Sequence, residues 1–274
     1  MHLWLINKIR AFVAKNSFFQ IKAYLRFLLN STNEHGLHSP FLFDLATKCF
    51  YDKKEYQEYT LLKNYRKELL NNDNVIKIKD FGAGSRVFKS DERQIKQIAQ
   101  NAGISAKRAK VLFRIVQYFQ PKEMLELGTS LGIATAGLAS GNKNSQVISL
   151  EGCPETAAVA TTQLKKHGFD NYEIIVGEFD AYLSTLPENK LFDLIYFDGN
   201  HQKEATLRYF DVLLKTASND TIWIFDDIHW SPGMEEAWQN IKSHPRVTVT
   251  IDTFQWGIIF FRREQEKEHF VVRI

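Results

Sequence analysis

The pattern of hydrophobic and polar residues changes near residue 120. Before that point apolar residues recur mainly at helical spacing, and Ser105 can cap a helix that runs to about Phe119. Beyond it, short apolar segments alternate with amphipathic ones. The apolar segments are EMLEL, QVISL, YEIIV, FDLIYF and TIWIF, and the helices expected after them span 131–140, 154–167, 180–186, 202–216 and 232–243.

This alternation predicts an α/β fold, with a doubly wound, mostly parallel sheet and helices on both faces. The chain ends differently, since VTVTID, WGIIFFR and HFVVRI follow with little helix between them, and this predicts a hairpin added at one edge of the sheet. We expect a helical extension or cap over residues 1–104 and a ligand-binding sheet domain over residues 105–274. Ligands of such sheets bind at the carboxyl ends of the strands.

Composition narrows the class of protein. With 274 residues, 44% hydrophobic and 24% charged, the chain has a globular composition, and a net charge of +3 is too small to indicate nucleic acid as a partner. Cys49 and Cys153 lie far apart, which argues against a disulfide framework and favours a cytoplasmic location. No apolar run approaches the roughly 18 residues of a membrane span, and no signal-peptide pattern is present.

Basic residues are concentrated at the start of the chain. Residues 1–33 carry five lysines and arginines and no acidic side chain. Apolar residues at helical spacing between them predict one or two basic amphipathic helices. We favour the interpretation that these helices dock on the body of the protein or on a second subunit of a homodimer. The alternative is that residues 1–30 contact an anionic membrane surface.

Two glycine-containing turns are candidates for holding a cofactor. The second one, Gly128–Gly132, follows the strand MLEL and leads directly into a helix, so that backbone N–H groups can face a ligand. Glu151 closes the next strand, where a carboxylate can bind both hydroxyls of a ribose. We therefore expect the second turn to hold the cofactor.

The first turn, Asp80–Ser85, has no helix directly after it, since the next plausible helix starts near Ser90. We interpret it as a glycine-rich bend between helical segments. The alternative is a lid loop that brings Asp80, Ser85 and Arg86 over a bound cofactor or substrate.

The second turn, E-L-G-T-S-L-G, resembles motif I of the class I S-adenosylmethionine-dependent methyltransferases, because its glycines are four residues apart. Glu151, VGEF (176–179), FDLIYFDGNH (192–201) and IWIFDDIHW (222–230) follow in the order of that family, and the last two are similar to the small-molecule, catechol-type O-methyltransferases. The resemblance covers about residues 105–265 and implies a seven-stranded, Rossmann-like sheet with S-adenosylmethionine as cofactor. It assigns cofactor binding to Glu126, Gly128, Thr129, Ser130, Gly132, Glu151, Gly177, Glu178 and Asp198.

Three carboxylates are expected at the ends of two adjacent strands. Asp198, Asp226 and Asp227 can converge there, and hard oxygen ligands of this kind suit Mg²⁺ or Mn²⁺. A bound ion would lower the pKa of an acceptor hydroxyl. Metal-dependent members of the resembled family use Asp, Asp and Asn, so Asp227 is a departure. The alternative role of Asp198 and Asp227 is to cap the helices that follow them.

The candidate catalytic residues are His201, His229 and Asp198. His201 stands where the catechol-type enzymes carry a lysine base, and a neutral imidazole is a competent base near neutral pH. His229, two residues beyond the Asp226–Asp227 pair, is a second candidate. For each histidine the alternative is a hydrogen-bonded structural role.

The leading hypothesis is a methyltransferase that methylates an oxygen of a small hydroxylated acceptor, with a divalent metal as a further expectation. The alternative from another class is a scaffold that binds the cofactor without catalysis and holds a membrane or partner through its basic amphipathic N-terminal helix. A nucleic-acid methyltransferase is disfavoured because no N/D-P-P-Y/F motif is present. The spacing of the glycines disfavours a nicotinamide-dependent oxidoreductase.

Overall fold

The computed structural model describes residues 18–79 and 90–274. The first glycine turn and most of the basic start of the chain lie outside the described residues. Our interpretations of that turn and of membrane contact therefore stay predictions. The strands are β1 (Val75–Lys77), β2 (Glu92–Gln94), β3 (Glu123–Leu127), β4 (Gln146–Glu151), β5 (Tyr172–Val176), β6 (Leu194–Phe197), β7 (Ile222–Asp226), β8 (Val249–Asp252), β9 (Trp256–Phe260) and β10 (Glu268–Val271).

The helices fall close to the predicted ranges after residue 105. They are α2 (Phe18–Asn30), η1 (Glu34–Gly36), α3 (Pro40–Leu45), η2 (Ala46–Phe50), α4 (Gln57–Leu70), α5 (Ile95–Asn101), α6 (Ala106–Phe119), α7 (Ile133–Gly141), α8 (Pro154–Lys166), α9 (Phe179–Ser184), α10 (Lys203–Leu213), η3 (Leu214–Thr216) and α11 (Pro232–Ser243).

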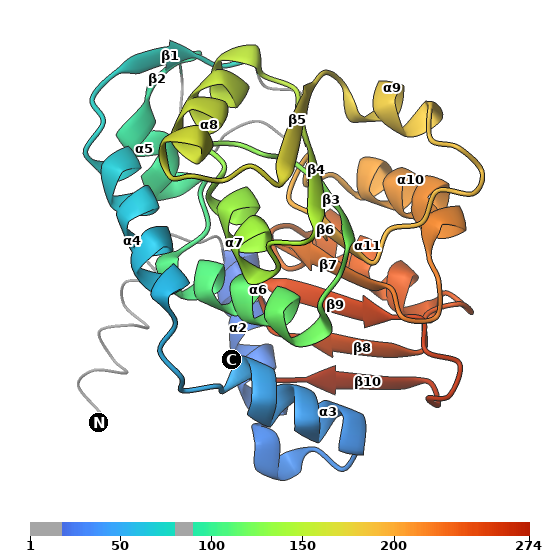
Figure 1. Cartoon of the computed structure of the whole chain (residues 1–274). Helices are drawn as coiled ribbons and strands as arrows, with labels where there is room; N and C mark the ends of the chain where they lie inside the picture. Colours follow the sequence, from blue (N-terminus) through green and yellow to red (C-terminus); the bar gives the residue numbers. More distant parts are fainter. Residues whose placement is uncertain (1–17, 80–89) are drawn as a thin grey trace.

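The central sheet has eight strands in the order β10-β8-β9-β7-β6-β3-β4-β5 (Figure 1). The five strands from β3 to β7 run parallel, β9 runs antiparallel to its neighbours β7 and β8, and β10 runs parallel to β8. The predicted α/β class and mostly parallel sheet are confirmed. The sheet has eight strands and not seven, because β10 pairs along β8 beyond the expected edge hairpin.

Helices cover both faces of the sheet, as predicted for a doubly wound fold. On β6, Leu194 and Tyr196 enter one hydrophobic core while Ile195 and Phe197 enter another, so this strand is buried along its whole length. The first core includes apolar residues of α4, α6 and α7, and the second includes those of α10 and α11.

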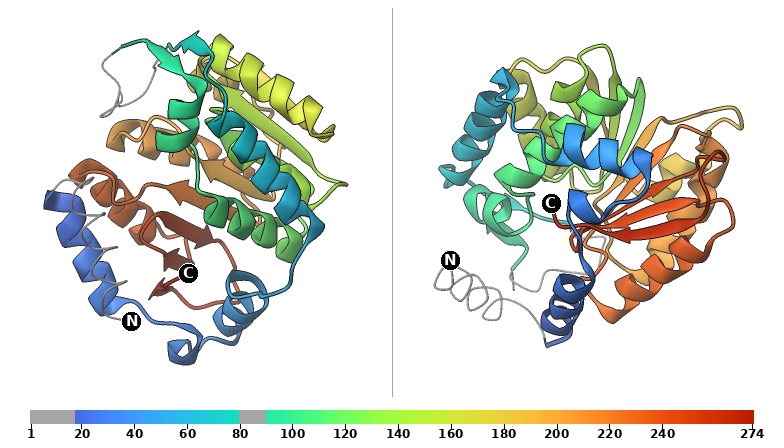
Figure 2. Two further views of the ribbon diagram at one scale, coloured as in Figure 1. Left: turned by 90° about the vertical axis from the view of Figure 1, so that its left-hand side faces the viewer. Right: turned by 90° about the horizontal axis from the view of Figure 1, so that it is seen from below.

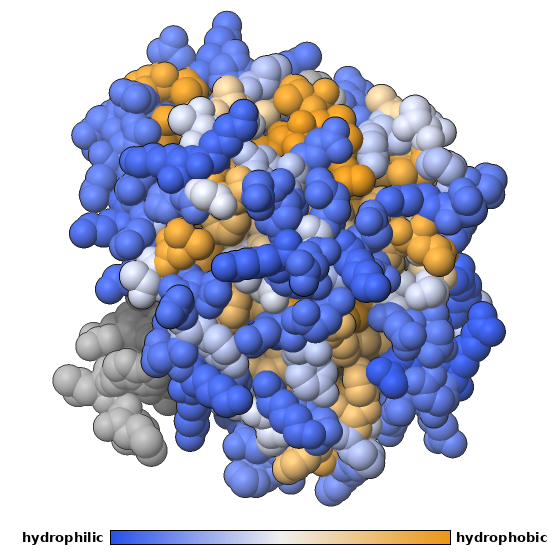
Figure 3. Space-filling model, viewed as in Figure 1, coloured by the Kyte–Doolittle hydropathy of each residue, from blue (hydrophilic) through white to orange (hydrophobic). Residues whose placement is uncertain are grey.

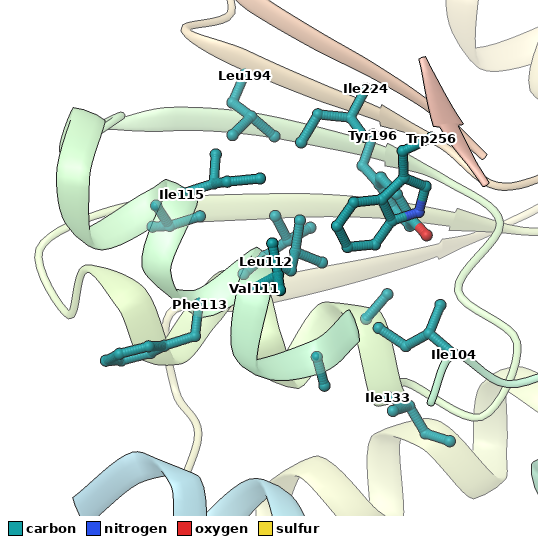
Figure 4. Close-up of a cluster of buried hydrophobic side chains, with 14 of the residues drawn as sticks. Ile104, Val111, Leu112, Phe113, Ile115, Ile133, Leu194, Tyr196, Ile224 and Trp256 are labelled. Atoms are coloured by element: carbon teal, nitrogen blue, oxygen red, sulfur yellow. The ribbon is translucent and has the colours of Figure 1, made fainter. Parts of the chain in front are cut away.

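Helix α6 begins and ends as its sequence predicts. The Ser105 side-chain oxygen accepts the backbone N–H of Arg108 at 3.2 Å, which caps the helix. Its apolar face packs on the sheet, and Figure 4 shows Leu112 in one cluster with the strand residues Leu194 and Ile224.

The N-terminal elements pack on the sheet domain (Figure 2). The rings of Tyr24 and Phe27 on α2 lie 4.8 and 5.6 Å from the ring of Phe254, between β8 and β9. Thr32 forms a parallel bridge with Val272 beside β10. The described helix α2 thus docks on the body of the protein, in line with the favoured interpretation, while the division at residue 104 stays a prediction.

The surface carries no large apolar area on the face drawn in Figure 3, where hydrophobic side chains form small separate patches. Within residues 18–79 and 90–274, no helix combines the length and the apolar character needed to cross a membrane.

Candidate active site

The second glycine turn joins β3 to α7 at the carboxyl end of β3. Gly128 and Gly132 have φ angles of 106° and 75°, in the left-handed region that glycine adopts readily. A Cβ atom on Gly128 would lie 2.3 Å from the backbone oxygen of Asp198, so no side chain fits there. Helix α7 starts at Ile133, directly after the turn. The predicted order of strand, glycine turn and helix is therefore present, and the first N–H groups of α7 lie at this end of the sheet.

A tyrosine from the N-terminal part of the chain holds this turn in place. The hydroxyl of Tyr65, on α4, donates to the backbone oxygen of Leu131 at 2.8 Å, and the side chain is fully buried. A Cβ atom on Gly132 would lie 2.5 Å from the same hydroxyl. The second glycine is thus needed for the close approach of α4 as well as for the backbone conformation.

Glu126 supports the turn from within the protein. Its carboxyl group is fully buried, and Oε2 accepts hydrogen bonds from the hydroxyls of Thr135 on α7 and Ser149 on β4. Burial raises the pKa of Glu126 to about 8, against the lowering effect of these hydrogen bonds. Its predicted contact with a cofactor stays a prediction, but the structure links Glu126 to both elements that flank the site.

Glu151 ends β4, beside the glycine turn. Its carboxylate oxygens accept the backbone N–H groups of Ser130 at 2.8 Å and Cys153 at 2.9 Å. Glu151 therefore lies beside the glycine turn, and its binding of a ribose stays a prediction.

Two further segments lie beside this end of the central sheet: the turn after β5, and the end of β1, which forms a separate two-stranded sheet with β2. The N–H of Gly177 donates to the backbone oxygen of Glu151 at 2.9 Å, and the exposed Glu178 follows at the start of α9. On another side, the N–H of Lys79 contacts the sulfur of Cys153 at 3.4 Å. Lys79 follows β1, which pairs antiparallel with β2.

Asp198 and His201 lie at the carboxyl end of β6, next to β3. The N–H of Asp198 donates to the backbone oxygen of Leu127 at 2.8 Å, which sets it against the glycine turn. Burial, followed by the negative charge of Asp226, raises the pKa of Asp198 well above its usual range. Nε2 of His201 lies 3.7 Å from Oδ1 of Asp198, and the histidine side chain is 26% exposed. The imidazole of His201 thus lies next to the carboxyl group of Asp198.

The carboxylate of Asp226 is fully occupied by protein groups. Nη1 of Arg108 donates to Oδ1 at 2.7 Å and to Oδ2 at 3.0 Å. Oδ1 also accepts the N–H of Asp227 at 2.8 Å, and Oδ2 accepts the hydroxyl of Tyr196 at 3.0 Å. Each oxygen thus accepts two hydrogen bonds, which is its usual capacity.

The predicted Mg²⁺ ligands do not fit a metal ion in this arrangement. In the part of the chain that the structure describes, no three His, Cys, Asp or Glu side chains are grouped so as to hold one. Asp226, one of the three predicted ligands, would have to release the guanidinium of Arg108 before it could bind a metal ion.

Arg108 is a site residue that the sequence analysis missed. Burial lowers its pKa, but the nearby carboxylates led by Asp226 raise it further, so the guanidinium stays charged. A signal was present in the sequence, because Arg108 stands three and four residues before Val111 and Leu112, on the apolar face of α6. A charged residue on such a face needs a buried partner.

His229 belongs to a second polar network. Its Nε2 lies 2.9 Å from Oδ2 of Asp252, and its Nδ1 lies 3.6 Å from Oε2 of Glu235. Glu235 is also paired with Arg26 of α2 at 2.8 Å, and the imidazole stacks on Phe254. These contacts fit the structural alternative for His229, whereas His201 is the histidine placed next to Asp198.

Comparisons with known proteins agree with this geometry. Residues 125–228, from β3 to just beyond β7, match the profile of a methyltransferase domain family. The catechol O-methyltransferase of Mycobacterium tuberculosis is 30% identical over 141 residues, which are 51% of this chain and 61% of the relative. The catechol O-methyltransferase of Niastella koreensis is 31% identical over 129 residues, which are 46% of this chain and 58% of the relative. The chain thus spans less than two thirds of the length of these relatives.

Solved structures share the fold at lower identity. A Podospora anserina methyltransferase bound to S-adenosylhomocysteine (SAH) gives a TM-score of 0.57 at 16% identity, over 82% of this chain and 97% of that one. The O-methyltransferase from Bacillus cereus in complex with SAH gives 0.52 at 19% identity, over 77% and 92%. The resemblance seen in the sequence is confirmed, and the chain contains a methyltransferase domain with the class I fold.

Proposed function

We propose that the protein transfers the methyl group of S-adenosylmethionine to an oxygen of a small hydroxylated acceptor. The observation that carries the proposal is the meeting of the Gly128–Gly132 turn, Glu151 and the Asp198–His201 pair at the carboxyl ends of β3, β4 and β6. The relatives named as catechol O-methyltransferases and the solved structures that hold SAH support the same class.

Each group at this edge has a role in binding the cofactor. The turn and the first N–H groups of α7 would bind the polar amino-acid end, because backbone donors at a helix start favour a carboxylate. Glu151 would accept the ribose hydroxyls. The Gly177–Glu178 turn, hydrogen-bonded to the end of β4, would lie beside the adenine, as the resemblance implies.

Methyl transfer is an in-line displacement at carbon. The acceptor oxygen forms a bond to the methyl carbon, the carbon–sulfur bond breaks, and its electron pair neutralises the sulfonium. The acceptor proton must leave, and the carboxylate form of Asp198 can take it; the raised pKa makes this form a stronger base than an ordinary aspartate but less populated at a given pH. His201, 3.7 Å away and partly exposed, can pass the proton to solvent.

The first test is calorimetric titration with SAH. We expect binding by the parent protein and at least about a tenfold loss in Glu151→Ala, since two hydroxyl hydrogen bonds are removed. Glu173→Gln, at an exposed position on the neighbouring strand β5, is the control and should bind as the parent does. Absence of SAH binding in folded parent protein would contradict the proposal.

Turnover is tested separately, with S-adenosylmethionine and a panel of phenols, aliphatic alcohols and carboxylic acids, by the mass gain of one methyl group. A protein that binds SAH and methylates none of them would favour the non-catalytic scaffold over the enzyme.

A further inference from the structure

We infer that Arg108 supplies the positive charge of this site in place of a divalent metal ion, so that the methyl transfer proposed above needs no metal. The inference rests on the proposed function for the reaction, but its central claim concerns the charge cluster and can be tested without turnover.

The contacts of Arg108 are those of a built-in counter-ion. Its guanidinium bridges both oxygens of Asp226, at 2.7 and 3.0 Å, and lies 5.9 Å from the centre of the Trp256 ring. The side chain of Asp226 is 3% exposed and that of Arg108 19% exposed. The buried hydroxyl of Tyr196 also donates to Asp226. The ring of Tyr196 lies near that of Trp256, as Figure 4 shows.

The guanidinium and a metal ion exclude each other at this position. A metal ligated by Asp226 would stand a few ångströms from a buried positive charge, where like charges repel strongly. Arg108 is paired with Asp226, and Asp226 also accepts the backbone N–H of Asp227, another of the predicted metal ligands. One arginine thus already neutralises one of the three carboxylates that the sequence assigned to Mg²⁺.

The presence of Arg108 in place of a metal ion limits which acceptor hydroxyls can react. A divalent ion lowers the pKa of a hydroxyl by direct coordination, whereas a guanidinium has only N–H donors and forms no coordinate bond to an acceptor oxygen. The proton must then be removed by Asp198 without that help. Acceptors with an acidic hydroxyl, such as phenols or carboxylic acids, should therefore be preferred over aliphatic alcohols.

The test is titration of Mn²⁺ into the metal-free protein, followed by electron paramagnetic resonance of the free ion. We compare the parent with Arg108→Gln, Asp226→Asn and the control Arg114→Gln. Arg114 lies on the same helix, but its guanidinium binds the backbone oxygens of Phe50 and Asp52. We expect Arg108→Gln to bind Mn²⁺ at least about tenfold more tightly than the parent, because a positive charge is removed from beside three carboxylates. Arg114→Gln should match the parent.

Measurements on the parent protein test the inference even if Arg108→Gln fails to fold. One Mn²⁺ per parent chain that is lost in Asp226→Asn would overturn the inference, as would turnover that stops on adding a chelator and returns with Mg²⁺. Weak Mn²⁺ binding that Asp226→Asn leaves unchanged belongs to other carboxylates and agrees with it. Absence of SAH binding would contradict the proposed function, and this result is independent of the Mn²⁺ titration.

Discussion

Replacing Glu126 by glutamine should change the way in which stability depends on pH. Burial raises the pKa of this carboxyl from 4.5 to about 8, so the folded protein keeps the proton that the unfolded chain releases in mildly acidic solution. Because the folded pKa is the higher one, the group's contribution to stability is complete below about pH 4.5 and is lost as the pH rises to about 8. Glutamine cannot ionise and lacks this dependence.

The magnitude follows from the size of the shift. A displacement of that size lowers the free energy of unfolding by up to about 5 kcal/mol between the two pKa values. The glutamine oxygen can accept the same hydroxyl hydrogen bonds from Thr135 and Ser149. Its NH₂ group replaces Oε1, which has no partner among the described residues, and it brings two donors where the protonated carboxyl has one; the additional unpaired buried donor costs about 1–3 kcal/mol. Glu126→Gln should therefore be less stable than the parent near pH 5 and more stable near pH 8.5.

Urea unfolding, followed by circular dichroism at several pH values, measures this reversal. Glu173→Gln, at an exposed position, removes a carboxylate of the same kind and should show no such reversal. A stability difference between Glu126→Gln and the parent that stays constant from pH 5 to 8.5 would refute the reasoning, because it would mean that Glu126 ionises alike in both states.

Three further predictions concern the edge of the sheet. Gly128→Ala should lower SAH affinity at least about tenfold and reduce stability in urea more than Gly168→Ala. Both glycines have positive φ, at 106° and 76°, but only the first would press a Cβ against the backbone of Asp198; equal effects would contradict this. Asp198→Asn should lower kcat about a hundredfold or more at near-constant SAH affinity, and should remove from the pH–rate profile the step that the raised pKa of Asp198 produces. His229→Gln should reduce stability by about 1 kcal/mol through its lost bond to Asp252 while kcat changes little; a large fall in kcat alone would make it catalytic.

The sequence predicted best those features that depend on local pattern. The strands EMLEL and FDLIYF and the helix capped by Ser105 are each determined by periodicity and capping within a few residues, and the structure has them nearly as expected. The convergence of Glu151 with the glycine turn followed from the rule that parallel strands end at one edge.

What the sequence did not predict depends on contacts between distant segments. Arg108 and Asp226 are 118 residues apart, and no spacing rule connects a helix start to the end of β7. The same holds for β10, whose pairing with β8 turned a seven-stranded expectation into eight strands. Arg108 and Asp226 each stand out in the sequence as charged residues among apolar ones. That they pair with each other can be recognised only from the fold.

The hydrogen bond from Tyr65 to the carbonyl of Leu131 makes helix α4 thermodynamically part of the cofactor turn. Any ligand that fixes the turn in its bound conformation must also favour the docked position of α4, and by reciprocity a looser α4 must weaken the ligand. Undocking of α4 and binding of a ligand to the turn would thus oppose each other. Under the proposed function, α4 would in this sense influence the affinity of the turn for its ligand.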